Sequence, residues 1–129
     1  MKKIVLIATL LMAFVGCSED SDMMTDNYYV KYVVDVSNMQ KAPLDVSVKS
    51  KSNKDLKFEI NDLNGYWEKV VGPVRKGFKA SMEVSHPVGK QIIHSEIYVR
   101  KNDGPFELKM RDDKFEWRTT LEMDYTIDF

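Results

Sequence analysis

The feature that most constrains the fold is an alternation of apolar and polar residues that begins at Tyr28 and recurs to the end of the chain. Successive side chains of a β-strand point to opposite faces of a sheet, so this period of two predicts strands with one face on a core and the other in solvent. No segment after residue 27 has the 3.6-residue period of an amphipathic helix. The alternation is clearest in the runs 28–36, 44–48, 56–60, 78–84, 93–99, 106–110 and 115–129.

Turn-forming residues separate these runs at short intervals. Asn64-Gly65 is the strongest signal, because both residues accept the positive φ of a type I′ hairpin turn. Gly72-Pro73 is expected to end the strand that starts at Tyr66. Seven or eight short strands without a helix predict an all-β fold, an antiparallel β-sandwich with immunoglobulin-like architecture. Residues 115–129 form the longest alternating run, so we expect one long strand that is central in its sheet or paired along its length.

A second feature is the apolar segment at the start of the chain. Lys2 and Lys3 precede the run 4–15, which only Thr9 interrupts. This run is too short for a membrane span, which needs about 20 apolar residues, and it matches the central region of a secretory signal. The segment Phe14-Val15-Gly16-Cys17 follows with the only cysteine of the chain. One interpretation of this start is an ordinary signal peptide in which the cysteine has no role.

This start resembles a bacterial lipoprotein signal with its lipobox. The resemblance implies that residues 1–16 are removed and that Cys17 is lipidated, becomes the first residue and anchors the chain to a membrane. Residues 17–27 are acidic and without periodicity, which predicts a flexible tether ahead of a sandwich domain at 28–129. The segment Ser18-Glu19-Asp20-Ser21-Asp22 resembles the surface-export signal of Bacteroidota lipoproteins. A location on the outer membrane, exposed at the cell surface, is what that resemblance implies.

Charge and cysteine content limit the possible functions. The chain has 19 basic and 20 acidic residues; removal of residues 1–16 takes away two lysines and leaves 17 against 20, a net charge of −3. This balance argues against nucleic acid as a partner, because nucleic-acid binding requires a basic excess. With Cys17 acylated, no thiol remains for disulfides, catalysis or metal binding. The likeness to immunoglobulin domains is therefore one of architecture alone.

The sequence does not indicate a catalytic or metal site. His86 and His94 lack metal-ligand spacing, and we expect both at the surface. The acidic pairs Asp112-Asp113 and Asp124/Asp128 are expected in a turn and on a solvent face. Phosphate-binding loops, nucleophile elbows and zinc-binding helices are absent from the sequence. We therefore expect no enzyme, no catalytic residue, no metal and no cofactor.

One stretch is a candidate ligand site. Tyr66 and Trp67 precede Lys69, Arg75 and Lys76 in a segment with several cations, and aromatic rings beside cations suit glycans or anionic groups. A solvated basic hairpin with a partly buried Trp is the alternative. The prediction is a lipid-anchored envelope protein that acts as a non-catalytic binding or accessory module for a glycan or an envelope protein. A purely structural spacer and a small hydrolytic enzyme are the other possibilities.

Overall fold

A computed structural model describes residues 25–35, 43–62, 65–87 and 89–129. The leader, Cys17, most of the acidic tether and Asn64 of the predicted hairpin turn lie outside the described residues. In the part of the chain that is described, no helix has the length and hydropathy that crossing a bilayer requires. The strands are β1 (Tyr28–Asp35), β2 (Leu44–Lys49), β3 (Asp55–Ile60), β4 (Tyr66–Val74), β5 (Lys79–Ser85), β6 (Gln91–Ile92), β7 (His94–Lys101), β8 (Glu107–Asp112), β9 (Trp117–Arg118) and β10 (Thr120–Thr126).

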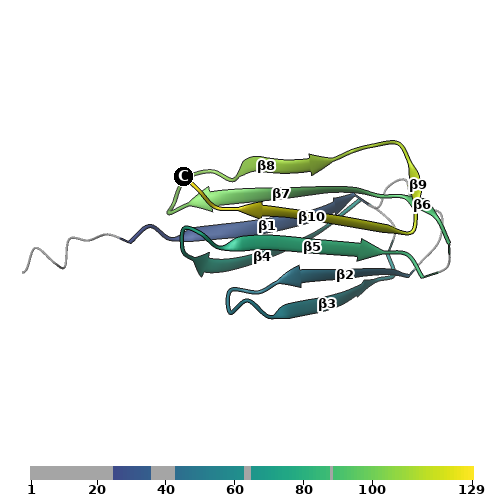
Figure 1. Cartoon of the computed structure of the whole chain (residues 1–129), viewed down its shortest axis with the longest axis horizontal. Coiled ribbons are helices and arrows are strands. Elements are labelled where there is room, and N and C mark those ends of the chain that lie inside the picture. Colours follow the sequence, from purple (N-terminus) through teal and green to yellow (C-terminus); the bar gives the residue numbers. More distant parts are fainter. Residues whose placement is uncertain (1–24, 36–42, 63–64, 88) are drawn as a thin grey trace, which may run out of the picture.

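Eight of these strands form two four-stranded antiparallel sheets that pack as a β-sandwich, which confirms the predicted fold class (Figure 1). We call the sheet with strand order β4-β1-β7-β8 sheet A and the sheet with order β10-β5-β2-β3 sheet B. The two-residue strands β6 and β9 pair with each other at one end of the sandwich. Each sheet therefore turns one face to the core and one face outward.

The core lies between the sheets and consists of the alternating apolar residues that the sequence indicates. Tyr28 and Tyr32 are its largest fully buried side chains. The Tyr28 hydroxyl donates to the backbone carbonyl of Phe129, and the Tyr32 hydroxyl donates to that of Lys49 at 3.1 Å. Burial raises the pKa of Tyr32, because the phenolate would lose its hydration. Both tyrosines thus fill the core without leaving a buried hydroxyl unpaired.

Strand β4 continues past Gly72-Pro73, so the prediction that this pair ends the strand is wrong. Because β4 is an edge strand, one of its sides has no neighbouring strand. Pro73 can therefore lack a backbone N–H without the loss of a hydrogen bond between strands. The register between β1 and β4 shifts between Tyr28 and Val30, which accommodates the irregular backbone. Gly72 has a φ of 142°, and a Cβ at this position would lie 2.8 Å from the Tyr28 carbonyl oxygen.

The run 115–129 forms two strands, so the prediction of one long central strand is wrong, although β10 is paired with β5 along its whole length. It is interrupted after β9, and β10 lies at the edge of sheet B, where it pairs with β5 only. Phe115 and Trp117, expected on the core face, are 77% and 54% exposed. The interruption arises because β9 pairs with β6, while the Thr119 carbonyl accepts from the His86 backbone N–H at 2.8 Å. Outward charges on β10 at Glu122 and Asp124 suit an edge strand.

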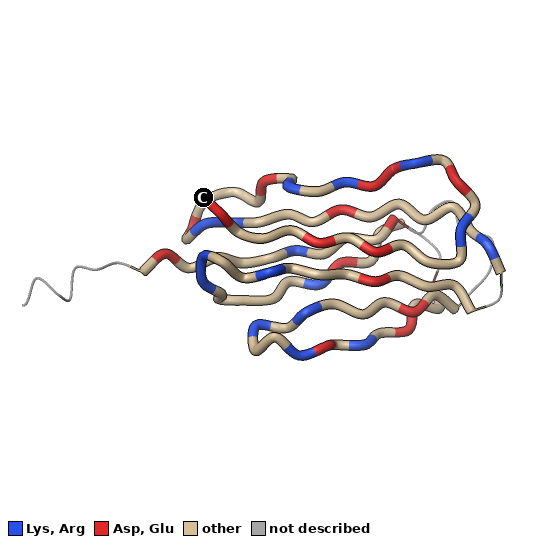
Figure 2. Tube along the Cα trace, in the orientation of Figure 1, with Lys and Arg blue, Asp and Glu red and all other residues tan. Residues whose placement is uncertain are grey.

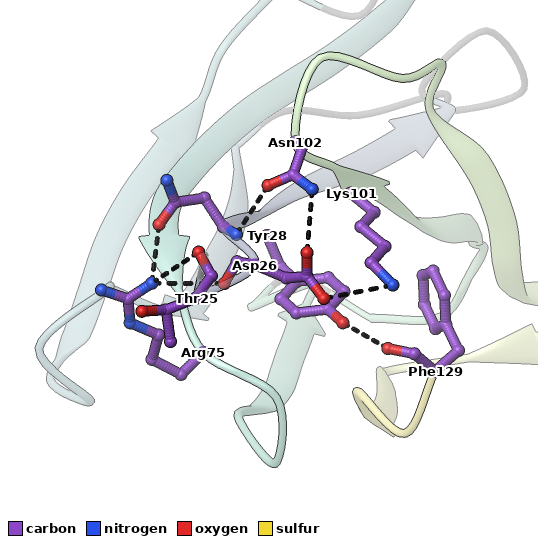
Figure 3. A network of polar contacts seen from close by, with 8 residues as sticks. Thr25, Asp26, Tyr28, Arg75, Lys101, Asn102 and Phe129 are labelled. Carbon is purple, nitrogen blue, oxygen red and sulfur yellow. Dashed lines mark hydrogen bonds and ion pairs between the residues drawn. The ribbon is translucent and has the colours of Figure 1, made fainter. Parts of the chain in front are cut away.

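Residues 25–27, predicted as the last part of the tether, are bound to the domain (Figure 3). Arg75 Nη1 donates to the carbonyls of Thr25 and Asp26 at 3.4 and 3.2 Å and to Asn27 Oδ1 at 2.8 Å. On the other side, Asp26 accepts from Asn102 at 3.0 Å and pairs with Lys101 at 3.2 Å. The hydrogen bond from Asn102 and the Lys101 charge lower the pKa of Asp26. Residues 25–27 are therefore held at the end of the sandwich where β1 begins.

Candidate functional site

The five residues of the predicted ligand site do not lie together. Trp67 and Lys69 are in phase with buried Val71 and turn toward the inner side of β4. The Trp67 ring packs against Phe58 of β3 at a centroid distance of 5.3 Å, and Lys69 Nζ lies 5.7 Å from the same Phe58 ring. These two side chains close the edge of the sandwich between β4 and β3. Trp67 is therefore partly buried, as the alternative reading of the sequence has it.

Arg75 and Lys76 follow the opposite end of β4. Nine positions separate Tyr66 from Arg75, which corresponds to about 30 Å of extended chain. The guanidinium of Arg75 binds residues 25–27 and so holds the segment before β1 against the end of β4. Of the predicted set, only Tyr66 remains on the outer face of sheet A, and its side chain is 68% exposed.

Tyr66 borders a hollow of about 270 Å³ on the outer face of sheet A. Neighbouring strands β4, β1 and β7 contribute to it, and these strands lie side by side in Figure 1. We call this feature the Tyr66 hollow; it is lined by Lys31, Val33, Tyr66, Glu68, Glu96 and Tyr98. Distant segments of the sequence meet here only because β1 pairs with both β4 and β7.

Val33 lies at the centre of the hollow. It alternates with the core residues Tyr32 and Val34, so it belongs to the outward face, yet only 7% of it is exposed. In the register of the sheet, Glu68 of β4 lies opposite Val33 on one side and Glu96 of β7 on the other. Two strand spacings, about 10 Å, therefore separate the backbone positions of these carboxylates. The hollow combines an apolar centre with acidic groups on both sides.

Hydrogen bonds fix the β7 side of the hollow. The Tyr98 hydroxyl donates to Glu96 Oε2 at 2.5 Å, and Arg111 Nη2 donates to the same oxygen at 3.1 Å. The hydrogen bond to the Glu96 carboxylate raises the pKa of Tyr98, because loss of the phenol proton would leave two negative groups in contact. The same carboxylate raises the pKa of Arg111. The Glu96 side chain is therefore held in place by two donors on neighbouring residues.

Cations cover the other aromatic rings of this face. Lys31 Nζ lies 4.7 Å from the ring centroid of Tyr98 and 4.7 Å from that of Phe106. The Arg100 guanidinium lies 4.5 Å from the Tyr29 ring. Among the described residues, no ring or cation contact involves Tyr66. Tyr66 is thus the aromatic ring of this face that remains open to a ligand.

The outer face of sheet B has a larger hollow, of about 500 Å³, with different chemistry. Asp45 lies directly opposite Glu59, and Glu83 lies directly opposite Glu122. In the described part of the chain, no group of three or more His, Cys, Asp or Glu side chains could hold a metal ion. The outward side chains that line this hollow of sheet B are carboxylates, serines and a lysine. Among the described residues, this face therefore offers no open aromatic surface.

The two histidines differ from expectation in one case. His86 is buried, with 3% exposure, so its predicted surface position is wrong. Its backbone N–H bond to Thr119 draws the end of β5 against the segment before β10. His94 is half-buried at the start of β7.

Asp112, expected in a turn, ends β8 and binds Arg118 through two hydrogen bonds of 2.8 and 3.0 Å.

No family model, curated protein or solved structure matches the chain. The site therefore depends on its own geometry. Sequence reasoning found Tyr66 but missed its strand neighbour Glu68, and it missed the four residues on β1 and β7, which are Lys31, Val33, Glu96 and Tyr98. The alternation placed these four residues on outward faces of their strands, and only the pairing of β1 with β7 brings them together.

Proposed function

We propose that the protein is a lipid-anchored cell-envelope protein that acts as a non-catalytic binding module, with the Tyr66 hollow as its ligand site. The lipobox-like segment ending at Cys17 supports the anchor, and the acidic residues after it support display on the outer membrane. Stable anchoring follows from the chemistry, since two or more acyl chains hold a protein at a bilayer whereas one holds it only marginally.

The position of the hollow relative to the tether carries the proposal. Residues 25–27 are bound beside the start of β1, whereas Tyr66 pairs with Asp35 at the end of β1 (Figure 1). Seven residue steps of β1 separate these levels, about 24 Å along the strand. In an anchored protein, the end of the sandwich at residues 25–27 faces the bilayer, and the hollow lies on the side of the sandwich toward the opposite end. A ligand in the surroundings of the cell could then reach Tyr66.

The anchor is tested with Cys17→Ser. We expect the variant to incorporate no fatty-acid analogue during metabolic labelling and to accumulate with its leader uncut or miscut. Wild-type protein should carry the label and fractionate with membranes. Equal labelling of the two proteins would contradict the lipobox.

The binding role is tested by cross-linking in intact cells that carry the full-length chain. We expect cross-linked products that are lost in Tyr66→Ala and retained in Phe115→Ala. The second variant is a matched control, because Phe115 is an exposed aromatic outside the hollow. Products that are insensitive to Tyr66→Ala would exclude the hollow as the ligand site and leave a structural spacer as the better explanation.

A further inference from the structure

We propose that the Tyr66 hollow binds an uncharged sugar residue of a glycan. This inference rests on the proposed function and adds the chemical class of the ligand. It follows from three properties of the hollow: an open aromatic ring, a small apolar centre, and hydrogen-bonding groups of both kinds around that centre.

The open ring and the apolar centre suit the C–H face of a sugar. A pyranose ring has one face of C–H groups that packs well on a flat aromatic surface, while its hydroxyls point outward in the ring plane. Tyr66 presents such a surface at 68% exposure, and no cation covers its ring within the described residues. Val33 provides an apolar contact at the bottom of the hollow, one strand away. An aromatic or apolar wall with a few placed polar groups is the usual form of a small-ligand site.

The polar groups around Val33 match hydroxyl groups. A hydroxyl is both a donor and an acceptor, so a site for several hydroxyls needs partners of both kinds within a few ångströms. Glu68 and Glu96 supply acceptors on either side of Val33, and the Lys31 ammonium supplies donors. The Tyr98 hydroxyl donates to Glu96, which leaves its oxygen able to accept. The Glu68 carboxylate has no hydrogen-bond or ion-pair partner among the described residues, so it is available to a ligand.

Other ligand classes fit the hollow less well. Asp35, Glu68 and Glu96 lie on this part of the outer face, so a phosphate or sulfate would meet carboxylates on two sides. An organic cation would meet Lys31, which already occupies the face of the Tyr98 ring. A purely apolar ligand would desolvate Glu68 without replacing its hydrogen bonds, which is unfavourable. An uncharged polyhydroxyl ligand avoids each of these conflicts.

Affinity electrophoresis of the full-length chain, extracted from membranes in mild detergent, tests the inference. The gels contain the neutral polysaccharides laminarin, xylan or pullulan, or the anionic polysaccharides heparin or polygalacturonate. We expect at least one neutral polysaccharide to retard the protein. In Tyr66→Ala, the apparent Kd for that polysaccharide should rise by about tenfold, the effect of losing one stacking surface. Tyr66→Phe should retain binding, because the ring face is unchanged.

Two further variants separate a local from a general effect. Phe115→Ala should bind within about twofold of the wild type, because it removes an exposed ring elsewhere. Glu68→Gln keeps the shape of the side chain and removes its charge; we expect weaker binding with an unchanged melting temperature. The inference is overturned if only heparin or polygalacturonate retards the protein, if no polysaccharide does, or if Phe115→Ala loses binding as Tyr66→Ala does.

The result also distinguishes this inference from the proposed function. If no polysaccharide binds but cross-linked products in cells still depend on Tyr66, the sugar is wrong and the binding module stands. If neither readout depends on Tyr66, both proposals are wrong.

Discussion

The two sheets have the same number of strands, but their outer faces carry different kinds of side chain. On sheet A, rings, apolar residues and charges are interleaved, whereas the outer face of sheet B carries carboxylates, lysines and serines. Charge alone does not separate the sheets, since acidic and basic residues occur on strands of both (Figure 2). The outward residues of sheet A include Tyr29, Lys31, Val33, Tyr66, Glu68, Glu96, Tyr98 and Arg100, and those of sheet B include Asp45, Ser47, Lys57, Glu59, Glu83, Ser85, Glu122 and Asp124.

The difference shows that the exposure of an outward residue depends on the length of the neighbouring side chains. Val33 of β1 is buried on the outer side of sheet A, because long neighbouring side chains surround it. Ser47 of β2 occupies the matching central position of sheet B and remains half-exposed among charged residues. Sheet A therefore offers a shaped, partly apolar surface that suits binding, while sheet B offers a hydrated surface that suits solubility.

The largest expected effect separates these two central positions. Val33→Asp removes a buried apolar side chain and places a third carboxylate between Glu68 and Glu96. We expect a loss of about 2–4 kcal/mol in the free energy of unfolding, from lost burial and like-charge repulsion. Ser47→Asp should lose less than about 1 kcal/mol, because Lys57 opposite it offsets Glu83. Urea denaturation of residues 25–129 measures both; equal losses would remove the distinction between the faces.

A smaller effect compares one ion pair from each sheet. Asp112 at the end of β8 in sheet A and its partner Arg118 of β9 are 20% and 18% exposed, whereas Lys79 and Asp124 on sheet B are 61% and 59% exposed. Asp112→Asn should lower the free energy of unfolding by about 1.5–3 kcal/mol, as expected for hydrogen bonds to a partly buried charge. Asp124→Asn should change it by less than about 0.5 kcal/mol. Chemical denaturation of both variants at neutral pH makes the comparison.

The same Asp112 pair predicts a dependence on pH. Hydrogen bonds from Arg118 hold the pKa of Asp112 below its usual value. Protonation of Asp112 therefore favours the unfolded state, in which the pKa of this carboxyl is about 3.9. The contribution of the pair is fully present above that pH and is lost as the pH falls through the lowered pKa of the folded state. Melting temperatures between neutral and strongly acidic pH should converge for wild type and Asp112→Asn; a constant difference would contradict this role.

The smallest expected effect is a stabilisation on sheet B. Glu83 and Glu122 lie directly opposite each other on β5 and β10, and like charges in this position repel. Glu122→Gln should therefore raise the free energy of unfolding by about 0.2–1 kcal/mol. Glu116→Gln is a control, since Glu116 is exposed and lies outside the strands. A destabilised Glu122→Gln variant would mean that this acidic pair has a partner on the sheet B surface.

Alternation in the sequence determined the fold class and most of the core. Tyr28, Val30, Tyr32 and Val34 are buried in the order that a period of two predicts, because a pleated strand has no other way to sort its side chains. The same local rule assigned outward positions to Lys31 and Glu96. It could not find the break before β10, since Phe115 and Trp117 continue the alternation, whereas Trp117 pairs with β6 outside the two main sheets and Phe115 lies in the exposed segment before β9.

Strand pairing decided what the sequence left open. Tyr66 stands apart from Trp67 because adjacent residues of a strand face opposite sides, and apart from Arg75 because an extended chain separates them by the length of β4. The Tyr66 hollow exists because β1 lies between β4 and β7, segments that are distant in the sequence. Periodicity is a property of each strand, whereas neighbours across a sheet depend on the packing of the whole chain, and the proposed binding surface is made of such neighbours.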